Sequence, residues 1–257
     1  MRDILEDAHK HKNDGYGRAQ AAEKKVLPKR FYKKVELVKV KNGFAIALDA
    51  KHIKTPSKKP VIIPNENLAQ ILLNEWQAQG EFIDAISMPF TRVINSALEG
   101  EEGIENALIL EIVNYGANDL LLYRAQDPQE LVLNQEKYWD SLLLKFSKKF
   151  GIKFISTIGI IHVEQPKASL EKLKSLLDGL DRFTLTSLTL ITSLTGSGLI
   201  AIALLHNLIS ADEAWKTAHV DEDFNDKIWG QDEEAIKRRN KRKVDFDVAI
   251  KIIEILS

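Results

Sequence analysis

Residues 35–48 read Val-Glu-Leu-Val-Lys-Val-Lys-Asn-Gly-Phe-Ala-Ile-Ala-Leu, and this stretch decides the first part of the fold. Apolar residues on both sides of Asn42-Gly43 predict two strands, and Asn-Gly is a preferred dipeptide for the turn of a β-hairpin. Two further short strands are expected at 52–54 and 61–63, the second ending before Pro64. The pattern therefore predicts a small antiparallel β unit of about 35 residues that is basic on its solvent-exposed face.

From Pro64-Asn65 onward the apolar residues follow a helical period. Asn65 is a suitable N-cap, and the helix that it begins is expected to stop at Gly80. Only 120–123 and 154–161 fit short strands. We therefore predict an α+β fold with a small antiparallel β domain at the N-terminus, followed by a larger all-helical domain. Its further helices are expected at 91–98, 104–115, 134–150, 170–180, 185–195, 199–207, 211–218, 223–228 and 246–256.

The expected domain division is a flexible arm over residues 1–25, the small β domain with its closing helix over 26–80, and the helical domain over 81–257. The arm is rich in charge and lacks the apolar core of a secretory signal, and acidic residues such as Asp3 and Glu6 argue against a transit peptide. We therefore expect the protein to be cytoplasmic in a bacterium.

The composition excludes several classes of protein. The chain has 257 residues, of which 44% are hydrophobic and 28% charged, and these values are typical of a globular protein. No run of about 18 uncharged apolar residues occurs, so we expect no membrane insertion. The absence of cysteine excludes disulfides, thiolate metal sites, iron–sulfur clusters and a cysteine nucleophile.

The net charge of −1 hides an uneven distribution. Residues 1–60 carry 16 basic and 7 acidic side chains, a net of +9, which leaves 20 basic and 30 acidic side chains, a net of −10, for the remainder. Seven of these acids lie at 221–234, and six bases follow at 237–243. A basic run admits nucleic-acid binding through phosphate contacts. Because no aromatic residues are interleaved to stack on bases, we favour an acidic helix and a basic helix that balance each other at the surface, and no nucleic-acid partner.

The strongest enzyme-like motif is Gly196-Ser197-Gly198-Leu199-Ile200-Ala201, which matches the dinucleotide fingerprint G-x-G-x-x-A. That fingerprint requires a strand before it and a helix after it, so that pyrophosphate meets the helix N-terminus. A nucleotide-dependent enzyme using 196–201 is therefore one hypothesis. We favour a glycine hinge between two packed helices, because no alternating strands and helices surround the motif.

Other catalytic and metal-binding patterns are weaker. Residues 221–226 are similar to the start of an EF-hand loop, but Asp226 stands where the loop needs Gly and Asp232 where it needs Glu. The six histidines form no H-E-x-x-H motif, and the sequence has neither a P-loop nor a G-x-S-x-G elbow. We therefore expect no enzyme activity, no bound cofactor and no metal.

A series of motifs occurs in a fixed order along the chain. They are Arg30-Phe31-Tyr32-Lys33, Gly43-Phe44, Leu48-Asp49, Lys54-Thr55-Pro56, Glu75-Trp76-Gln77-Ala78-Gln79, Met88-Pro89-Phe90-Thr91-Arg92 with Asn95, Asp119-Leu120-Leu121, Tyr123-Arg124, Gln135 with Trp139-Asp140, Glu213-Ala214 and Trp229 to Ala235. The ordered set resembles the family of F-type ATP synthase assembly chaperones dedicated to the α subunit, in a bacterial member. Where that family usually has Gly-Arg after Leu-Asp, this chain has Ala50-Lys51.

The resemblance implies a chaperone and not an enzyme. Members bind the free ATP synthase α subunit and shield its β-facing interface during assembly of the catalytic head. The resemblance further implies a protein without cofactor that is monomeric when free.

The family pattern W-G-x-x-E matches Trp229, Gly230 and Glu233 of this sequence. The resemblance therefore implies Glu233 as the partner-binding carboxylate, with Glu234 and Asp232 as its neighbours. Trp229 lies within the acidic run and is the expected aromatic anchor of an interface.

The alternative for Glu233 is a structural role. It would then cap a helix or form an ion pair with Lys237 or Arg238, and the i,i+4 spacing to Lys237 makes such a pair easy to form.

Overall fold

The computed structural model describes residues 27–257, which form two compact units. The smaller unit contains residues 27–31 and 79–84, and the larger contains 32–78 and 85–257. In the smaller unit two extended segments pair, since the Arg30 amide donates to the Glu81 carbonyl and the Ile83 amide to the Pro28 carbonyl, both at 2.8 Å. The arm expected at 1–25 lies outside the described residues, and a domain boundary at residue 80 stays a prediction.

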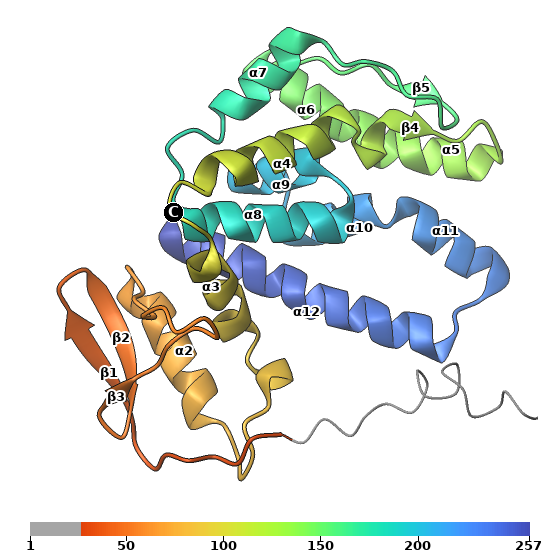
Figure 1. The fold of residues 1–257 in the computed structure, drawn as a ribbon. Helices are drawn as coiled ribbons and strands as arrows, with labels where there is room; N and C mark the ends of the chain where they lie inside the picture. Colours follow the sequence, from red (N-terminus) through yellow and green to blue (C-terminus); the bar gives the residue numbers. More distant parts are fainter. Residues whose placement is uncertain (1–26) are drawn as a thin grey trace, which may run out of the picture. The chain divides into compact units, whose positions relative to one another are not determined.

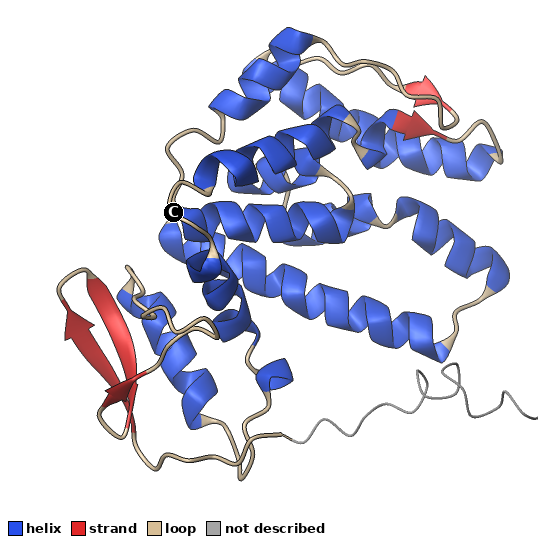
Figure 2. Ribbon diagram, viewed as in Figure 1, coloured by secondary structure: helices blue, strands red, loops and turns tan. Residues whose placement is uncertain are grey.

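The antiparallel sheet of the larger unit has the strand order β1-β2-β3, namely β1 (Val35–Val40), β2 (Gly43–Leu48) and β3 (Lys51–His52) (Figures 1 and 2). The predicted hairpin is confirmed, with Val40 opposite Gly43 and Leu37 opposite Ile46. Gly43 has φ +143°, and a Cβ there would overlap the Ile63 carbonyl oxygen. Glycine is therefore required by both the backbone angle and the close approach of residue 63.

The strand predicted at 61–63 is wrong. Ile63 makes an isolated bridge with Phe44, and Pro60 just before the segment makes another with Lys54, so no continuous ladder forms. Pro60 and Pro64 flank it, and proline has no amide hydrogen to donate to a neighbouring strand. The strand expected at 52–54 is also shorter than predicted and is shifted to β3.

The turn between β2 and β3 holds two non-glycine residues in the left-handed region, Asp49 at φ +46° and Ala50 at φ +69°. The Asp49 carboxylate supports this turn by accepting from the backbone amides of Lys33, at 3.1 Å and 3.2 Å, and Lys34, at 2.8 Å. Ala50 therefore stands in a turn conformation that favours glycine.

The rest of the larger unit is mainly helical (Figure 2). Its α-helices are α2 (Glu66–Gln77), α3 (Pro89–Glu99), α4 (Glu105–Ala117), α5 (Gln129–Gln135), α6 (Ser141–Phe150), α7 (Lys167–Ser175), α8 (Arg182–Thr195), α9 (Gly198–Leu205), α10 (Ala211–Ala218), α11 (Val220–Trp229) and α12 (Glu233–Leu256). A π turn at Glu136–Asp140 joins α5 to α6, and 3-10 turns occupy Ala85–Ser87 and Leu120–Leu122. The Asn65 side chain accepts from the Leu68 amide at 3.2 Å, so the predicted N-cap of α2 is confirmed.

Helix α8 lies at the centre of the helical core. It contacts α3, α4, α9 and α12, and in Figure 1 it runs between α4 and α12. The core contains fully buried large side chains such as Ile112, Trp139, Phe146, Leu188 and Phe246. Removal of this apolar surface from water is the main driving force for packing the helices together.

A second, two-stranded sheet pairs β4 (Tyr123–Arg124) with β5 (Thr157–Ile158) in parallel. The strand expected at 120–123 is therefore mostly a 3-10 turn, because the Asp119 side chain accepts from the Leu121 amide and initiates a turn there. Of the strand expected at 154–161, only β5 pairs. The predicted α+β class is confirmed, with this small parallel pair as an addition to the helical part.

Across residues 27–257, no helix combines the length and the apolar character needed to cross a membrane.

Candidate partner-binding surface

The sequence-predicted contact residues Trp229, Asp232, Glu233 and Glu234 all lie where α11 ends and α12 begins. Gly230, at φ +80°, ends α11 and turns the chain. The Asp232 side chain then accepts from the Ala235 amide at 2.8 Å and caps α12. Glu233 and Glu234 occupy the first turn of α12, where the partial positive charge of a helix N-terminus favours carboxylates.

This connection exposes apolar side chains among acidic ones. Trp229 is 83% exposed, and Ile228 and Ile236 on either side of it are also exposed. We call residues 228–236 the hairpin tip. A large exposed ring beside aliphatic side chains is typical of an interaction site, since tryptophan is among the residues most enriched at interface hot spots.

The carboxylates of the hairpin tip make only weak ion pairs within the chain. Glu233 lies 3.8 Å from Lys237 and Glu234 lies 3.3 Å from Arg238, and all four side chains are exposed. Exposed i,i+4 pairs contribute about 0.3–0.5 kcal/mol. The structural alternative for Glu233 is therefore present as an ion pair, but the pair is weak enough to exchange for a partner's cation.

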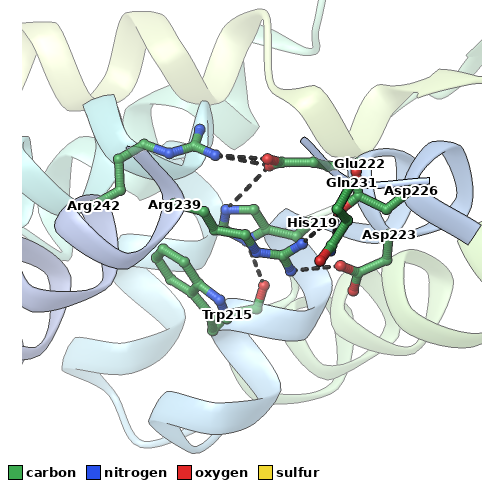
Figure 3. A network of polar contacts seen from close by, with 8 residues as sticks. All are labelled: Trp215, His219, Glu222, Asp223, Asp226, Gln231, Arg239 and Arg242. Atoms are coloured by element: carbon green, nitrogen blue, oxygen red, sulfur yellow. Dashed lines mark hydrogen bonds and ion pairs between the residues drawn. The ribbon is translucent and has the colours of Figure 1, made fainter. Parts of the chain in front are cut away.

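Three of the four acidic residues of α11, Glu222, Asp223 and Asp226, are engaged with the basic run of α12. Figure 3 shows Arg242 donating to both oxygens of Glu222, at 2.8 Å and 2.9 Å, while Arg239 pairs with Asp223 and, at 3.3 Å, with Asp226. This network joins α11 to the first half of α12. Gln231 belongs to it as well, because its amide donates to Asp226 at 2.6 Å.

The network argues against the alternative of nucleic-acid binding through residues 237–243. Five of the six bases in this run form ion pairs with acids of α11 or α12, and Lys243, through Asp247, is one of the five. Within the described residues, Lys241 is the member of the run without an ion pair. A surface so neutralised offers a phosphate backbone little net positive charge.

His219 lies at the base of this network and is buried. Its Nδ1 donates to the Trp215 carbonyl at 2.7 Å, and its ring packs on the Trp215 indole with centroids 4.0 Å apart (Figure 3). The other nitrogen, Nε2, faces Glu222 at 3.6 Å. Burial lowers the pKa of His219 from its ordinary value, because desolvation disfavours the imidazolium form.

The residues of the other family motifs hold the helices together. The Glu75 carboxylate accepts from the Phe90 and Thr91 amides, both at 2.8 Å, and so fixes the start of α3. Arg92 joins α3 to α12 through Asp245 at 2.7 Å. The Trp139 indole donates to the Thr217 carbonyl at 2.8 Å. In contrast to these structural roles, the motif at the hairpin tip leaves its tryptophan and glutamates exposed.

The hypothesis of a dinucleotide fingerprint at 196–201 is wrong, because no strand precedes it. Helix α8 ends at Thr195, Gly196 caps it at φ +67°, and Ser197 caps the following helix α9. A Cβ on Gly198 would overlap the Ile112 carbonyl oxygen and lie 3.0 Å from the Gly116 amide nitrogen. Gly198 therefore allows α9 to approach α4 closely, and Gly196 provides the left-handed turn between α8 and α9, as the hinge interpretation expected.

Sequence reasoning did not identify the role of Asp119, a fully buried carboxylate. One oxygen accepts from the Leu121 amide at 3.2 Å and the other from the Leu199 amide at 2.9 Å. Burial raises the pKa of Asp119 to about 7, although the hydrogen bonds from Ser197 and Leu199 oppose that rise. The signal in the sequence that could have identified Asp119 is that it belongs to the Asp119-Leu120-Leu121 motif.

The described fold and surface define the class of this protein: an α+β protein whose helical part exposes aromatic and acidic side chains at a helix–helix connection. Residues 29–147 match the family described as ATP12 chaperone protein. The mitochondrial protein atp12 of Schizosaccharomyces pombe is 23% identical over 220 residues, which cover 80% of this chain and 75% of that protein.

Solved structures agree with this family match. The Atu1473 protein of Agrobacterium tumefaciens is 39% identical with a TM-score of 0.86, covering 95% of this chain and 92% of that one. Atp12 from Paracoccus denitrificans is 34% identical with a TM-score of 0.82, covering 90% of this chain and 99% of that one. The chain therefore belongs to the ATP12 chaperone family, which serves assembly of the ATP synthase. The family recognised from the ordered motifs is confirmed.

Proposed function

We propose that this protein is a chaperone that binds the free ATP synthase α subunit in the bacterial cytoplasm. It shields the β-facing interface of that subunit during assembly of the catalytic head, and it acts as a monomer without enzymatic activity or cofactor. The observation that carries the proposal is the exposed hairpin tip, where Trp229 is 83% exposed among carboxylates held only by weak pairs.

The chemistry of an unassembled ring subunit supports this function. Such a subunit exposes a large apolar interface, and exposed apolar surface causes aggregation. A chaperone must cover that surface and yet leave when the permanent partner arrives. An interface of about 1,600 Å² with exchangeable charge pairs at its edge satisfies both needs.

In the proposed complex, Trp229 supplies the apolar anchor, while Glu233, with Glu234 and Asp232 as neighbours, supplies negative charge for basic groups of the client. Release of Glu233 from Lys237 is easy because both side chains are exposed. Asp232 is less free than the glutamates, because its carboxylate also caps α12. We therefore expect the larger effect on binding from Glu233.

The test is binding and aggregation protection with purified α subunit. Glu233→Lys should weaken the complex tenfold or more, because it places a cation where the client meets a carboxylate. Glu66→Lys is the matched control, since Glu66 is likewise an exposed glutamate in the first turn of a helix, α2. Both reversals oppose a helix dipole, so both variants should lose similar, small amounts of stability.

Two results would contradict the proposal. If wild-type protein forms no complex with the α subunit and does not slow its aggregation, the function itself is wrong. If the complex forms and Glu233→Lys binds as tightly as Glu66→Lys, the function stands but the assignment of the carboxylate fails.

A further inference from the structure

Residues 155–161, Ile-Ser-Thr-Ile-Gly-Ile-Ile, form an exposed apolar segment, and we call them the isoleucine loop. Its four isoleucines are between 47% and 93% exposed, with Ile160 and Ile161 at the upper end. No ionisable side chain occurs from Phe154 to Ile161. Single exposed aliphatic residues are ordinary on a protein surface, but four within seven residues mark a contact site.

The isoleucine loop is held by specific hydrogen bonds at its base. Buried Gln165 accepts from the Ile155 amide at 2.8 Å and donates to the Ile155 and Val163 carbonyls at 2.9 Å and 3.0 Å. The Ser169 hydroxyl also donates to the Lys153 carbonyl at 2.7 Å. One glutamine thus ties both ends of the loop together. A loop fixed at its base loses less conformational entropy when a partner binds it.

The isoleucine loop also contains the edge of a sheet. Within it, β5 pairs with β4 on one side, and Gly159 extends the pairing by donating to the Arg124 carbonyl at 2.8 Å. In the described part of the chain this sheet has two strands, so no third strand pairs with the other side of β5. An open edge next to β-branched side chains can accept a further strand from another chain.

We propose that the isoleucine loop binds an extended, uncharged apolar segment of the same client that contacts the hairpin tip. This inference rests on the function proposed above. The lack of charge in the loop sets the chemistry of the occupant, because a charged segment would be desolvated there without a counter-charge. The occupant therefore presents apolar side chains and a free strand edge.

The size of the loop argues for a client and against a second copy of this chain. A stable interface needs about 800 Å² from each partner, and four isoleucine side chains supply only part of that area. A loop of this size contributes usefully when the partner is also held elsewhere, which the hairpin tip would do. Once one of two linked sites has bound the client, the client is held near the other site at a high effective concentration. The complex is then tighter than either contact alone would make it.

The experiment measures the affinity of full-length variants for purified α subunit. Ile160→Ser should weaken the complex at least tenfold, whereas Ile160→Val should stay within about threefold because it keeps a β-branched apolar side chain. Leu144→Ser is the matched control, since Leu144 is an exposed aliphatic residue on α6. Both replaced side chains are exposed, so the melting temperatures of all three variants should match that of the wild type.

The outcomes separate the two proposals. If the wild type does not bind the α subunit, the proposed function fails first, and binding of an apolar client segment by the loop fails with it. If the wild type binds and Ile160→Ser binds equally well, only the loop proposal fails. Two other results would assign the loop to another occupant and overturn the proposal. One is that the free protein sediments as a dimer and Ile160→Ser dissociates it. The other is that the protein binds phosphatidylglycerol vesicles and Ile160→Ser abolishes that binding. In the complex, amides 158–162 should gain protection from hydrogen exchange.

Discussion

Asp119 should control how the stability of this protein depends on pH. Its carboxylate is fully buried and receives hydrogen bonds from the Leu121 and Leu199 amides. Burial raises its pKa from the ordinary value of 3.8 to about 7. In the unfolded chain the carboxyl group returns to its ordinary value, because water again solvates the charge. Between these two values, the folded protein keeps a proton that the unfolded chain releases.

The sign and the size of the effect follow from this difference. Because the pKa is higher in the folded state, the stability contributed by the protonated carboxyl is fully present below pH 3.8 and is lost as the pH rises through about 7. A tenfold change in proton affinity corresponds to about 1.4 kcal/mol, so the full change is about 4 kcal/mol. Between pH 5 and pH 8 we expect a loss of about 2–3 kcal/mol.

The assay compares wild type with Asp119→Asn by urea unfolding followed by circular dichroism at pH 5, 6, 7 and 8. Asparagine does not titrate, but its amide offers one acceptor oxygen where the carboxyl group offers two. It should leave a buried amide hydrogen unsatisfied, which costs about 1–3 kcal/mol. We therefore expect the wild type to be the more stable protein at pH 5, and this advantage to shrink by about 2–3 kcal/mol by pH 8.

Other titrating groups, such as His219, are common to both proteins and cancel in the difference. Asp212→Asn removes an exposed carboxylate from the first turn of α10 and controls for the change in net charge. If the difference in the free energy of unfolding between wild type and Asp119→Asn stays constant from pH 5 to pH 8, the argument about Asp119 is wrong. A difference that grows with pH would refute it as well, because it would mean that the folded state stabilises the charged form.

Two further variants test the backbone. Gly198→Ala should lower the free energy of unfolding by about 1–3 kcal/mol, because its Cβ would overlap the Ile112 carbonyl; at roughly 2–4 °C per kcal/mol this is visible in a melting curve. Gly80→Ala, with no atom within 4 Å of the added Cβ, should change stability little, and equal losses in both variants would count against the packing argument. Ala50→Gly should raise stability by up to about 1 kcal/mol in urea unfolding, because it relieves the left-handed conformation at φ +69°. A loss of stability at residue 50 would show that the entropy of glycine in the unfolded chain outweighs that relief.

Much of the fold can be predicted because the decisive signals are local. Asn42-Gly43 between two apolar runs indicates the hairpin, and Asn65 indicates the start of α2, since a turn dipeptide and a capping side chain act within a few residues. The same holds for the glycine hinge after α8. The hairpin-tip residues could be predicted as a group because they are adjacent in sequence, between Trp229 and Glu234.

The predictions of secondary structure fail where residues distant in sequence determine the local conformation. Apolar periodicity predicts a helix only over 246–256, which is the last part of α12. The helix in fact begins at Glu233, because Asp232 caps it there and acids of α11 form ion pairs with its basic first half. Residues 154–161 are apolar and β-branched, which favours a buried strand. Their exposure follows from Gln165, which closes the segment into a loop, and a hydrogen bond of this kind leaves no pattern in the sequence.

The two halves of α12 are held by different forces. From Phe246 onward the helix is fixed by buried apolar side chains, whereas residues 233–245 include no buried side chain and are held to α11 through Arg239 and Arg242. Salt screens partly exposed ion pairs and leaves apolar packing nearly unaffected. Raising the ionic strength therefore loosens the first half of α12 and leaves the second half in place. The hairpin tip thus belongs to a segment that can open locally, at a small fraction of the free energy of global unfolding. Under the function proposed above, a client that binds the hairpin tip repositions this segment without disturbing the core.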